Sequence, residues 1–385
     1  MTLAPEIGID PFAVTVRGID EPHPARAVLR AAGPIVRVEG RAGGPVWIVT
    51  DEALARRVFV HPQIAKDPGL APTHWDPRTA GLEPPAAEQL SLTTSDGSTH
   101  TRLRAAHAPL FTALRMGGYV ERMAAFAHTL LTVCAESGDT VDLMADFATR
   151  YPLTVICDLL GVPVDRIEQA IAACRRMYSD DQADVGMAMS AFADLGAAAL
   201  RAGGDGLAVA LRDRLTDEVT DQQLHYLLFT LIYAGQLTTD PVLGFLLAGV
   251  LDPERDPADE PPIEELVRET LRMHPPAPFT LWRFTTADIT LAGVRLAAGS
   301  PLLIDIQGIN TGPRRTNGRD LSFGAGPHYC TGAHLAQFEL AAVVRTLRTS
   351  FPHARLTVPY AELRQTDFGG IQGSRLSALP VQLRE

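Results

Sequence analysis

The chain alternates long stretches in which apolar residues recur at helical spacing with short apolar runs bounded by glycine and proline. Residues Pro24 to Ala32 carry alanine, valine and leucine at helical spacing, and Gly33-Pro34 predicts the end of that helix. Two apolar runs, 35–38 and 46–49, flank a glycine-rich segment, which predicts a β-hairpin. Thr50-Asp51 then predicts the N-cap of a further short helix.

The most apolar helical stretch lies in the second half of the chain. Thr220-Asp221 predicts its start, and apolar residues surround the helix nearly all round from Leu224 to Leu251. Such a helix is expected to run buried through the core. Residues 165–200 show amphipathic helical spacing. Residues 70–92, in contrast, are rich in proline and have little periodicity, which is typical of a lid or binding loop.

Short strand-like runs return in the last third of the chain. We expect a strand pair at 289–291 and 294–296, and a terminal hairpin formed by 367–371 and 379–381. The whole pattern predicts a mainly α protein with small β-sheets. Length alone would divide 385 residues into two or three domains.

Composition narrows the class of protein. The chain has 385 residues, 46% of them apolar, and a formal net charge of −11, which argues against nucleic-acid binding by electrostatics. Its four scattered cysteines do not form a disulfide framework. The N-terminus lacks the basic and apolar regions of a signal peptide, and the longest apolar run, Leu227 to Gly235, is too short to span a bilayer. We therefore expect a cytoplasmic protein that does not bind membranes.

The segment Phe323 to Gly332 reads F-G-x-G-x-H-x-C-x-G and is followed at once by a helical pattern. Its three glycines allow backbone conformations closed to other residues and let a flat ligand approach the chain. A thiolate at Cys330 would lie just before a helix N-terminus, where the helix dipole and unpaired N–H groups stabilise it. These are the properties of an axial cysteine ligand to haem iron.

Cys330 has two other interpretations, a buried apolar residue and a zinc ligand. A single cysteine is most often a small buried apolar residue. A zinc site with His328 and His334 would need a fourth ligand and usually paired cysteines. The other three cysteines, Cys134, Cys157 and Cys174, are distant in sequence and show no such pairing.

Position for position, this segment is similar to the haem-binding loop of the cytochrome P450 family, and the resemblance extends over about residues 20–385. It implies the cytochrome P450 fold in one domain over residues 1–385, with a sheet-rich part at about 20–70 and a helical part at about 90–350. It also implies a haem b cofactor (heme b, iron protoporphyrin IX) whose iron is bound by Cys330. It also implies that Phe323 shields the sulfur and that the loop amides tune its potential. The remaining residues that the resemblance assigns to the haem are Gly324 and Gly332 in the loop, and His100, Arg104, Arg283 and His328 at the propionates.

Within the long apolar helix, Ala234-Gly235-Gln236-Leu237-Thr238-Thr239 resembles the family's A-G-x-[D/E]-T-[T/S] segment. In the family the small residues let the porphyrin approach and the threonine orients oxygen. The chain departs from this pattern at Leu237, where an acid is usual. Because Pro241 has no N–H, the carbonyl of Leu237 should be free, and we expect a kink there. One hypothesis is that this carbonyl holds a water, and that the water, Gln236 or a substrate hydroxyl completes a proton relay to Thr238. The alternative is that Leu237 packs against an apolar substrate.

Two E-x-x-R pairs follow, Glu265/Arg268 and Glu269/Arg272. The family's structural pair precedes a proline by three or four residues, which selects Glu269/Arg272 and leaves the other pair as a solvated one. The segment from Asn310 to the haem loop is shorter than the family's, so a third partner for Glu269/Arg272 is in doubt.

The resemblance implies a monooxygenase or oxidase that uses O2 and electrons from a ferredoxin or similar partner. Arg102, Arg314, Arg315 and Arg319 are expected to form a basic patch for that partner. We expect a small-to-medium substrate, a natural-product intermediate that includes the carrier-protein-bound kind. Candidate substrate contacts are Phe279, Thr280, Leu281 and Ile371. Two alternatives stay open at this point: a peroxide-driven haem enzyme, and a haem protein that binds a ligand or partner without turnover.

Overall fold

The computed structural model describes residues 5–177, 181–215, 219–255, 261–313, 319–367 and 369–384. The chain forms two compact units, each built from segments far apart in sequence. The sheet unit comprises Met1–Thr101, Glu269–Cys330 and Arg364–Arg375. The helical unit comprises Arg102–Arg268, Thr331–Leu363 and Leu376–Glu385.

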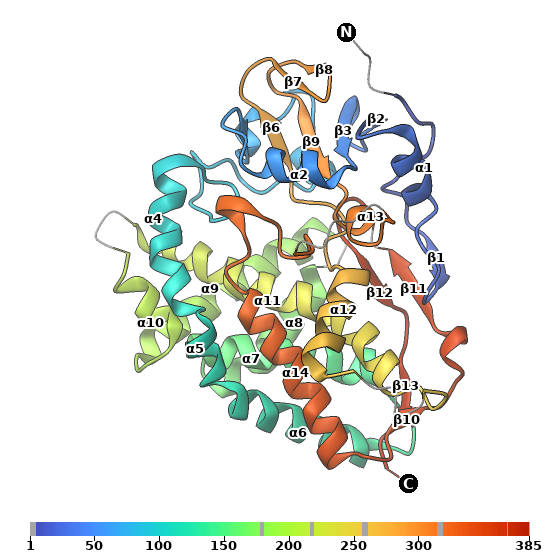
Figure 1. The fold of residues 1–385 in the computed structure, drawn as a ribbon. Coiled ribbons are helices and arrows are strands. Elements are labelled where there is room, and N and C mark those ends of the chain that lie inside the picture. The colour runs from blue at the N-terminus through green and yellow to red at the C-terminus, as the bar shows by residue number, and fades with distance from the viewer. Residues whose placement is uncertain are drawn as a thin grey trace. The chain divides into compact units, whose positions relative to one another are not determined.

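A five-stranded sheet in the order β2-β3-β9-β6-β4 forms the core of the sheet unit (Figure 1). Strands β2 (Ile35–Glu39) and β3 (Pro45–Val49) pair antiparallel, which confirms the first predicted hairpin. Strand β9 (Pro301–Ile304) runs parallel to β3, with Ile48 opposite Leu303. It is antiparallel to β6 (Arg283–Thr285), which in turn pairs with β4 (Ile64–Ala65).

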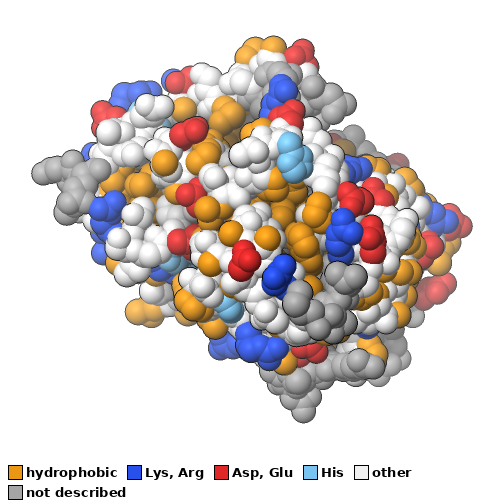
Figure 2. Space-filling model, turned by 90° about the horizontal axis from the view of Figure 1, so that it is seen from above, with side chains coloured by type: hydrophobic (Ala, Val, Ile, Leu, Met, Phe, Trp, Pro, Cys, Tyr) orange, Lys and Arg blue, Asp and Glu red, His pale blue; other side chains and the backbone are white. Residues whose placement is uncertain are grey.

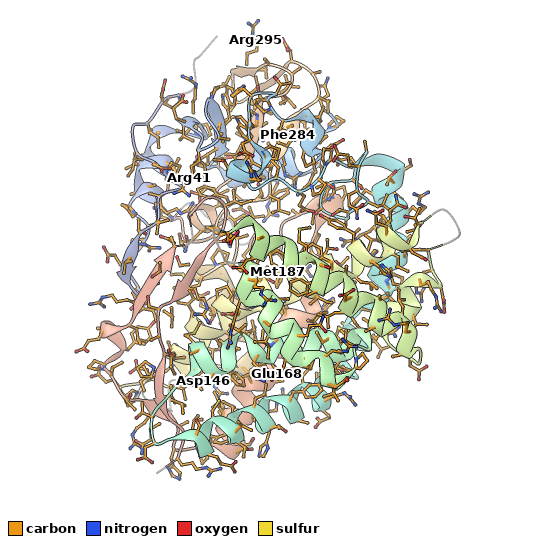
Figure 3. The ribbon with its side chains drawn as sticks, turned by 180° about the vertical axis from the view of Figure 1, so that it is seen from behind. Arg41, Asp146, Glu168, Met187, Phe284 and Arg295 are labelled. Atoms are coloured by element: carbon orange, nitrogen blue, oxygen red, sulfur yellow. The ribbon has the colours of Figure 1, made fainter. Side chains whose placement is uncertain are left out.

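Short helices and a separate hairpin surround this sheet. Helix α1 (Ala25–Ala32) ends at Gly33, and α2 (Glu52–Phe59) begins at Asp51, whose carboxylate accepts a hydrogen bond from the Leu54 N–H. The predicted strand pair forms β7 (Ile289–Leu291) and β8 (Val294–Leu296). In Figure 3 Phe284 lies within the unit, where it is fully buried, whereas Arg295 projects from the outer end of the hairpin. The other short elements of this unit are η1 (Pro68–Leu70), α3 (Pro77–Ala80), α13 (Ile306–Asn310) and η6 (Gly326–His328).

The predicted terminal hairpin is wrong in its second strand. Strand β11 (Arg364–Asp367) lies between β1 (Val16–Gly18) and β12 (Ser374–Leu376), so the hairpin is β11–β12, and Gly369 and Gly370 turn between them at positive φ. Residues 379–381 instead belong to β13 (Pro380–Gln382), which pairs with β10 (Arg355–Leu356) and β5 (Val141–Asp142). Apolar alternation alone did not show which of two nearby strands closes the turn.

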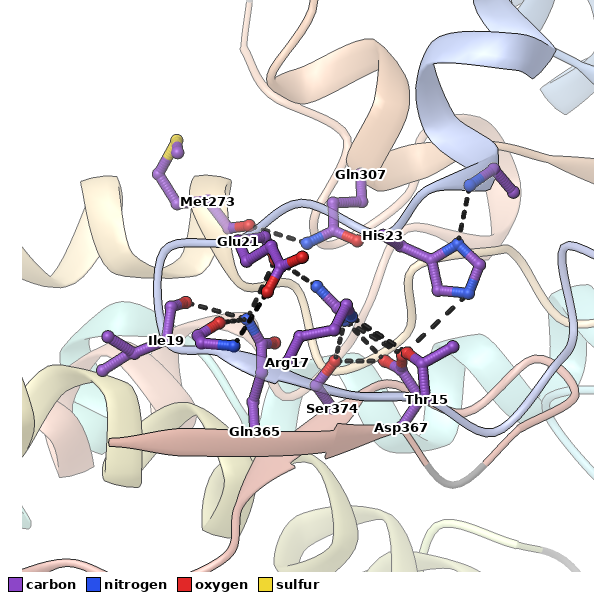
Figure 4. Close-up of polar contacts among 12 residues, drawn as sticks. Thr15, Arg17, Ile19, Glu21, His23, Met273, Gln307, Gln365, Asp367 and Ser374 are labelled. Carbon is purple, nitrogen blue, oxygen red and sulfur yellow. Dashed lines mark hydrogen bonds and ion pairs between the residues drawn. The ribbon is translucent and has the colours of Figure 1, made fainter. Parts of the chain in front are cut away.

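A buried carboxylate ties this hairpin to the N-terminal strand (Figure 4). Both oxygens of Asp367 accept hydrogen bonds from Arg17 Nη2 at 3.0 Å, and the hydroxyls of Thr15 and Ser374 also donate to this carboxylate. These donors lower the pKa of Asp367, although burial acts in the opposite direction. The β1–β11–β12 sheet is therefore held by charge-assisted hydrogen bonds as well as by its ladder.

The helical unit is organised around α11 (Asp221–Val250), which begins at the predicted capping residue Thr220. Helices α7 (Arg150–Leu160), α9 (Gln182–Ala202) and α14 (Ala333–Ser350) pack against it (Figure 1). The further helices are η2 (Ala108–Leu110), α5 (Ala113–Gly117), α6 (Val120–Ser137), η3 (Met144–Ala148), η4 (Val164–Arg166), α8 (Ile167–Met177), α10 (Leu207–Arg212) and η7 (Tyr360–Glu362). Helices α4 (Gly97–His107) and α12 (Ile263–Met273) each continue from one unit into the other.

Helix α11 is long and apolar enough to cross a bilayer by length and composition alone, because it extends well beyond the run Leu227 to Gly235. Its most apolar window is 67% buried within the protein. That burial is typical of a core helix, as its all-round apolar pattern predicts.

The mainly helical fold with small sheets is confirmed. The division into parts differs from the expected one, because the sheet unit also takes in the segments that contain β6, β9, β11 and the loop before Cys330. A single domain stays a prediction.

Candidate functional site

The loop Phe323–Cys330 presents the one exposed cysteine among the four in the chain, all of which the structure describes. Gly324 and Gly326 both adopt a φ of 70°, and a Cβ at Gly326 would lie 2.9 Å from the Val60 side chain and 3.1 Å from the Phe59 carbonyl. Only glycine fits that position. The Cys330 N–H donates to the Phe323 carbonyl at 2.9 Å, which folds the loop back on itself.

The other cysteines lie in the helical unit and are buried. Burial raises the pKa of the Cys134 thiol to about 11 and that of the Cys157 and Cys174 thiols to about 12. A neutral buried thiol is inert, so these residues are packing residues.

A cluster of basic side chains, called the cationic cluster below after its buried arginine, lies in the same unit as the loop. Arg283 on β6 is buried, its guanidinium carbon lies 4.9 Å from the centre of the Phe59 ring, and burial lowers its pKa to about 10. The rings of His100 and His328 lie 4.0 Å apart, and His328 Nε2 lies 3.2 Å from Asp96 Oδ1. The structure thus brings together three of the four predicted propionate ligands. The fourth, Arg104, lies on α4 within the helical unit.

The residues of this unit fit a haem. The Nε–H of Arg283 is buried and has no hydrogen-bond partner among the described groups. A buried cation whose donor lacks a partner is costly, so the cluster is suited to an anionic ligand such as a propionate carboxylate. The exposed thiol of Cys330 and the glycine turns supply the ligand and the close backbone approach.

The zinc interpretation gains no support from the geometry. Among the residues that the structure describes, no group of three or more His, Cys, Asp or Glu side chains is placed to hold a metal ion. Haem ligation remains consistent with Cys330, because the porphyrin holds the iron and the protein has to supply one ligand rather than four.

The pair Glu269/Arg272 forms, but it is not buried as expected. Arg272 Nε donates to Glu269 Oε2 at 2.7 Å, and the side chains are 48% and 16% exposed for Glu269 and Arg272 respectively. The third partner is a backbone group, since Arg272 Nη1 donates to the Asn310 carbonyl. The Asn310 side chain in turn accepts a hydrogen bond from the Leu321 N–H and donates one to the Ser322 hydroxyl, directly before the loop Phe323–Cys330. The pair Glu265/Arg268 is fully on the surface, as predicted.

This geometry changes the expected cost of breaking the pair. Arg272→Ala should destabilise the fold by roughly 1–3 kcal/mol, because the Asn310 carbonyl loses a charged donor. Glu269→Ala should cost about 0–1 kcal/mol, as for an exposed pair, instead of the larger loss of a buried one. Glu265→Ala is the matched control, and chemical denaturation of the three variants tests the order. A larger loss for Glu269→Ala than for Arg272→Ala would contradict it.

The oxygen-helix residues, by which we mean the segment Ala234 to Thr239, lie in the middle of α11, in the helical unit. Ala234 is exposed, and Gly235, Leu237 and Thr238 are half-buried. The Thr238 hydroxyl donates to the Ala234 carbonyl at 2.8 Å, which leaves its oxygen available as an acceptor. The helix continues through Pro241, so the carbonyl of Leu237 has no N–H from residue 241 to bond.

Gln236 does not share this face. It is fully buried, and its Nε2 donates to Asp240 Oδ2 at 3.2 Å, where the Thr149 hydroxyl also donates at 2.6 Å. Residues 236 and 238 are about 200° apart around a helix. The structure therefore does not support Gln236 as a direct partner of Thr238, because its Nε2 donates to Asp240 on another side of the helix.

Of the four candidate substrate contacts, two are buried within the sheet unit and two are more exposed. Phe279 is buried against Phe12 and under the Arg26 guanidinium, and the Thr280 hydroxyl accepts the Ile304 N–H. Both pack within the sheet unit, and their role as substrate contacts stays a prediction. Leu281 is 40% exposed, and Ile371 is half-buried beside the same apolar cluster. These two remain candidates.

Asp96 is a site residue that the sequence analysis did not identify. Its carboxylate accepts from the Lys66 backbone N–H at 2.6 Å and contacts His328. The only sequence signal for a role of Asp96 is its position four residues before His100, at the start of α4. An acidic residue at that position is also typical of an ordinary helix start, so the signal is weak.

Comparison with known proteins agrees with the chemistry of these groups. No family model matches the chain. The chain is 40% identical to the cytochrome P-450 monooxygenase DoxA of Streptomyces sp. (strain C5), over 99% of each protein. It is 30% identical to the mycinamicin IV hydroxylase/epoxidase of Micromonospora griseorubida, over 88% of this chain and 90% of the relative. The structure of CYP154C4 from Streptomyces sp. W2061 is similar, with a TM-score of 0.80, 28% identity, and 100% and 98% of the two chains covered.

Proposed function

The chain belongs to the cytochrome P450 family, and from this premise we propose that it hydroxylates or otherwise oxidises an organic natural-product intermediate on a haem b ligated by Cys330. Its relatives are cytochrome P450 monooxygenases, which makes the chain an enzyme of that class. The observation that carries the haem assignment is the exposed Cys330 on a loop that also supplies His328 to a buried cationic cluster.

When bound, a thiolate-ligated haem supplies dioxygen activation and transfer of an oxygen atom. The residues of the chain bind and orient it. Cys330 donates the thiolate, and Phe323 and the loop amides adjust the electron density at sulfur. Arg283, His100 and His328, together with Arg104, neutralise the propionates.

Residues of α11 act on the oxygen side in this proposal. Ala234 and Gly235 leave room for the flat cofactor, because neither has a side chain larger than a methyl group. Thr238 accepts and passes a proton through its hydroxyl oxygen. Leu237 cannot carry a proton, so the source of protons must be a water or the substrate.

The relatives support an organic substrate, since one is named a hydroxylase/epoxidase of mycinamicin IV. We propose a small-to-medium intermediate of a biosynthetic pathway, free or tethered to a carrier protein, that contacts Leu281 and Ile371. The test is a screen of such compounds for a haem spin-state shift, followed by product analysis with O2, NADPH, a ferredoxin and its reductase. Absence of any oxidised product from every compound that shifts the spectrum would instead favour a binding protein without turnover.

A peroxide-driven enzyme is the second candidate, because the missing acid at Leu237 weakens proton delivery during O2 reduction. Hydrogen peroxide alone would then support turnover at the rate of the ferredoxin system. We expect a much slower peroxide reaction, since several relatives are named monooxygenases.

For the electron donor we propose an acidic ferredoxin that contacts Arg102 and Arg319; Arg314 and Arg315 of the predicted patch lie outside the described residues. Figure 2 shows that on one face of the protein blue and red side chains of the described residues are intermingled. Because the formal net charge is −11, an acidic partner would have to be attracted by local positive charge at these arginines. Arg102→Glu and Arg319→Glu should each slow the association rate with ferredoxin at low salt, and the difference should shrink as salt rises. Arg295→Glu on the β7–β8 hairpin is the matched control. Stopped-flow rates equal to the parent at low salt would exclude these arginines from the contact.

A further inference from the structure

Lys66 is the only lysine in the chain, and it is buried. It follows β4, whose last residue, Ala65, pairs with Phe284 on β6. This register brings Lys66 next to Arg283, the buried arginine of the cationic cluster. Only 6% of its surface is exposed, although lysine is almost never buried without a paired charge.

The charged groups around Lys66 do not include a dedicated partner. Arg283, from β6, repels its ammonium group, and Glu83 and Asp96, from the segment before α4, attract it. Among the described residues, no carboxylate oxygen lies within 4.0 Å of the Lys66 ammonium nitrogen. Glu83 accepts from the hydroxyls of Ser91 and Thr93, and Asp96 contacts His328 and the Lys66 backbone N–H.

The arrangement therefore contains more buried positive charge than negative charge. Arg283 and Lys66 are both buried, the rings of His100 and His328 lie beside them, and the two carboxylates that attract Lys66, Glu83 and Asp96, are only half-buried. In the absence of an anion the pKa of Lys66 is lowered to about 7, first by burial and then by Arg283. A protein keeps such a charge arrangement where an anionic ligand completes it.

We propose that Lys66 is a further cofactor-binding residue, whose ammonium group binds a carboxylate of the haem alongside Arg283. This inference rests on the proposed function, because the propionate is the anion. It adds a linkage: the bound carboxylate raises the pKa of Lys66, so haem binding takes up a proton there. Below pH 7 both forms are protonated and Lys66 adds no pH dependence; above pH 7 haem affinity falls as pH rises, until the raised pKa is passed.

Because Lys66 is the only lysine, one isotope label reports on it alone. Holoenzyme made with lysine labelled with ¹³C at Cε should give a single lysine signal, and its titration in the ferrous carbon monoxide form gives the Lys66 pKa directly. We expect a value well above 7, and a signal strongly broadened in the paramagnetic ferric form. A titration near 7, or equal line widths in the two forms, would overturn the proposal.

Haem transfer to apomyoglobin supplies a second readout, which does not depend on turnover. Lys66→Met should lose haem about tenfold faster than the parent at pH 7, as expected for the loss of one charge-assisted hydrogen bond. Lys66→Arg, which keeps the charge, should lie close to the parent, and Arg295→Met is a surface control. Equal loss rates for the parent and Lys66→Met would contradict the inference. If the parent bound no haem at all, shown by the lack of a Soret band, the proposed function itself would fail.

Discussion

Replacing Cys330 by serine is expected to abolish the long-wavelength Soret band of the reduced carbon monoxide complex. That band requires a thiolate on the haem iron, and a serine hydroxyl stays protonated at neutral pH and is a weak ligand. Cys330 is the one exposed cysteine of the four, and the loop that carries it contains two glycines at positive φ. Absorption spectra of the dithionite-reduced proteins under carbon monoxide give the result directly.

The matched control is Cys134→Ser in α6. Its thiol is buried and its pKa is raised, so it is a neutral thiol and does not act as a metal ligand. This variant should keep the full band and lose only a little stability. Retention of the band in Cys330→Ser, or its loss in Cys134→Ser, would mean that the ligand was assigned wrongly.

Local sequence signals were sufficient for many elements of the fold. Gly33 ends α1, Asp51 caps α2 and Thr220 caps α11, each at a residue whose local chemistry allows few alternatives. The all-round apolar pattern of α11 also predicted its burial. These features depend on residues within one or two turns of each other, so they can be read without knowledge of the rest of the chain.

Contacts between distant segments could not be predicted in this way. Strand β11 pairs with β1, and Asp367 binds Arg17, 350 residues earlier in the chain. Several short apolar runs compete for such a partner, and alternation does not rank them. The same reason hides the bond between Asp96 and His328, 232 residues apart. Packing across the fold selects these pairs.

The candidate site shows the same limit at single residues. The motif placed Gln236 beside the oxygen-helix threonine in sequence, but one helical step rotates a side chain by about 100°, and Gln236 is directed at Asp240. Phe279 is a candidate substrate contact because of its place after the prolines that follow Arg272. In the structure its ring is buried under the Arg26 guanidinium. A motif gives the identity and spacing of residues, whereas burial depends on what the rest of the chain places against them.

Proton delivery at Leu237 is the departure from the family pattern with the largest expected effect. Gln236 Nε2 donates to Asp240, away from Thr238, so a water or a substrate hydroxyl is the relay partner that this geometry favours. The Leu237 carbonyl has no N–H from Pro241 to accept, and a carbonyl with a spare lone pair in a helix is a suitable anchor for a water. We predict that this water donates to Thr238, whose hydroxyl hydrogen is already bonded to the Ala234 carbonyl.

Pro241→Ala would restore an N–H at residue 241 and close the bond to the Leu237 carbonyl. It should therefore raise the release of hydrogen peroxide per NADPH consumed several-fold, because reduced oxygen that receives no proton at the right place is lost as peroxide. Leu237→Asp should lower peroxide release below the parent, since an acid at this position supplies protons directly. Val242→Ala, the next residue on α11, controls for general loosening of the helix. Peroxide release in Pro241→Ala equal to that of the parent would remove the carbonyl-bound water from the relay. In that case Leu237 serves to pack against an apolar substrate, and Leu237→Asp would weaken substrate binding without improving coupling.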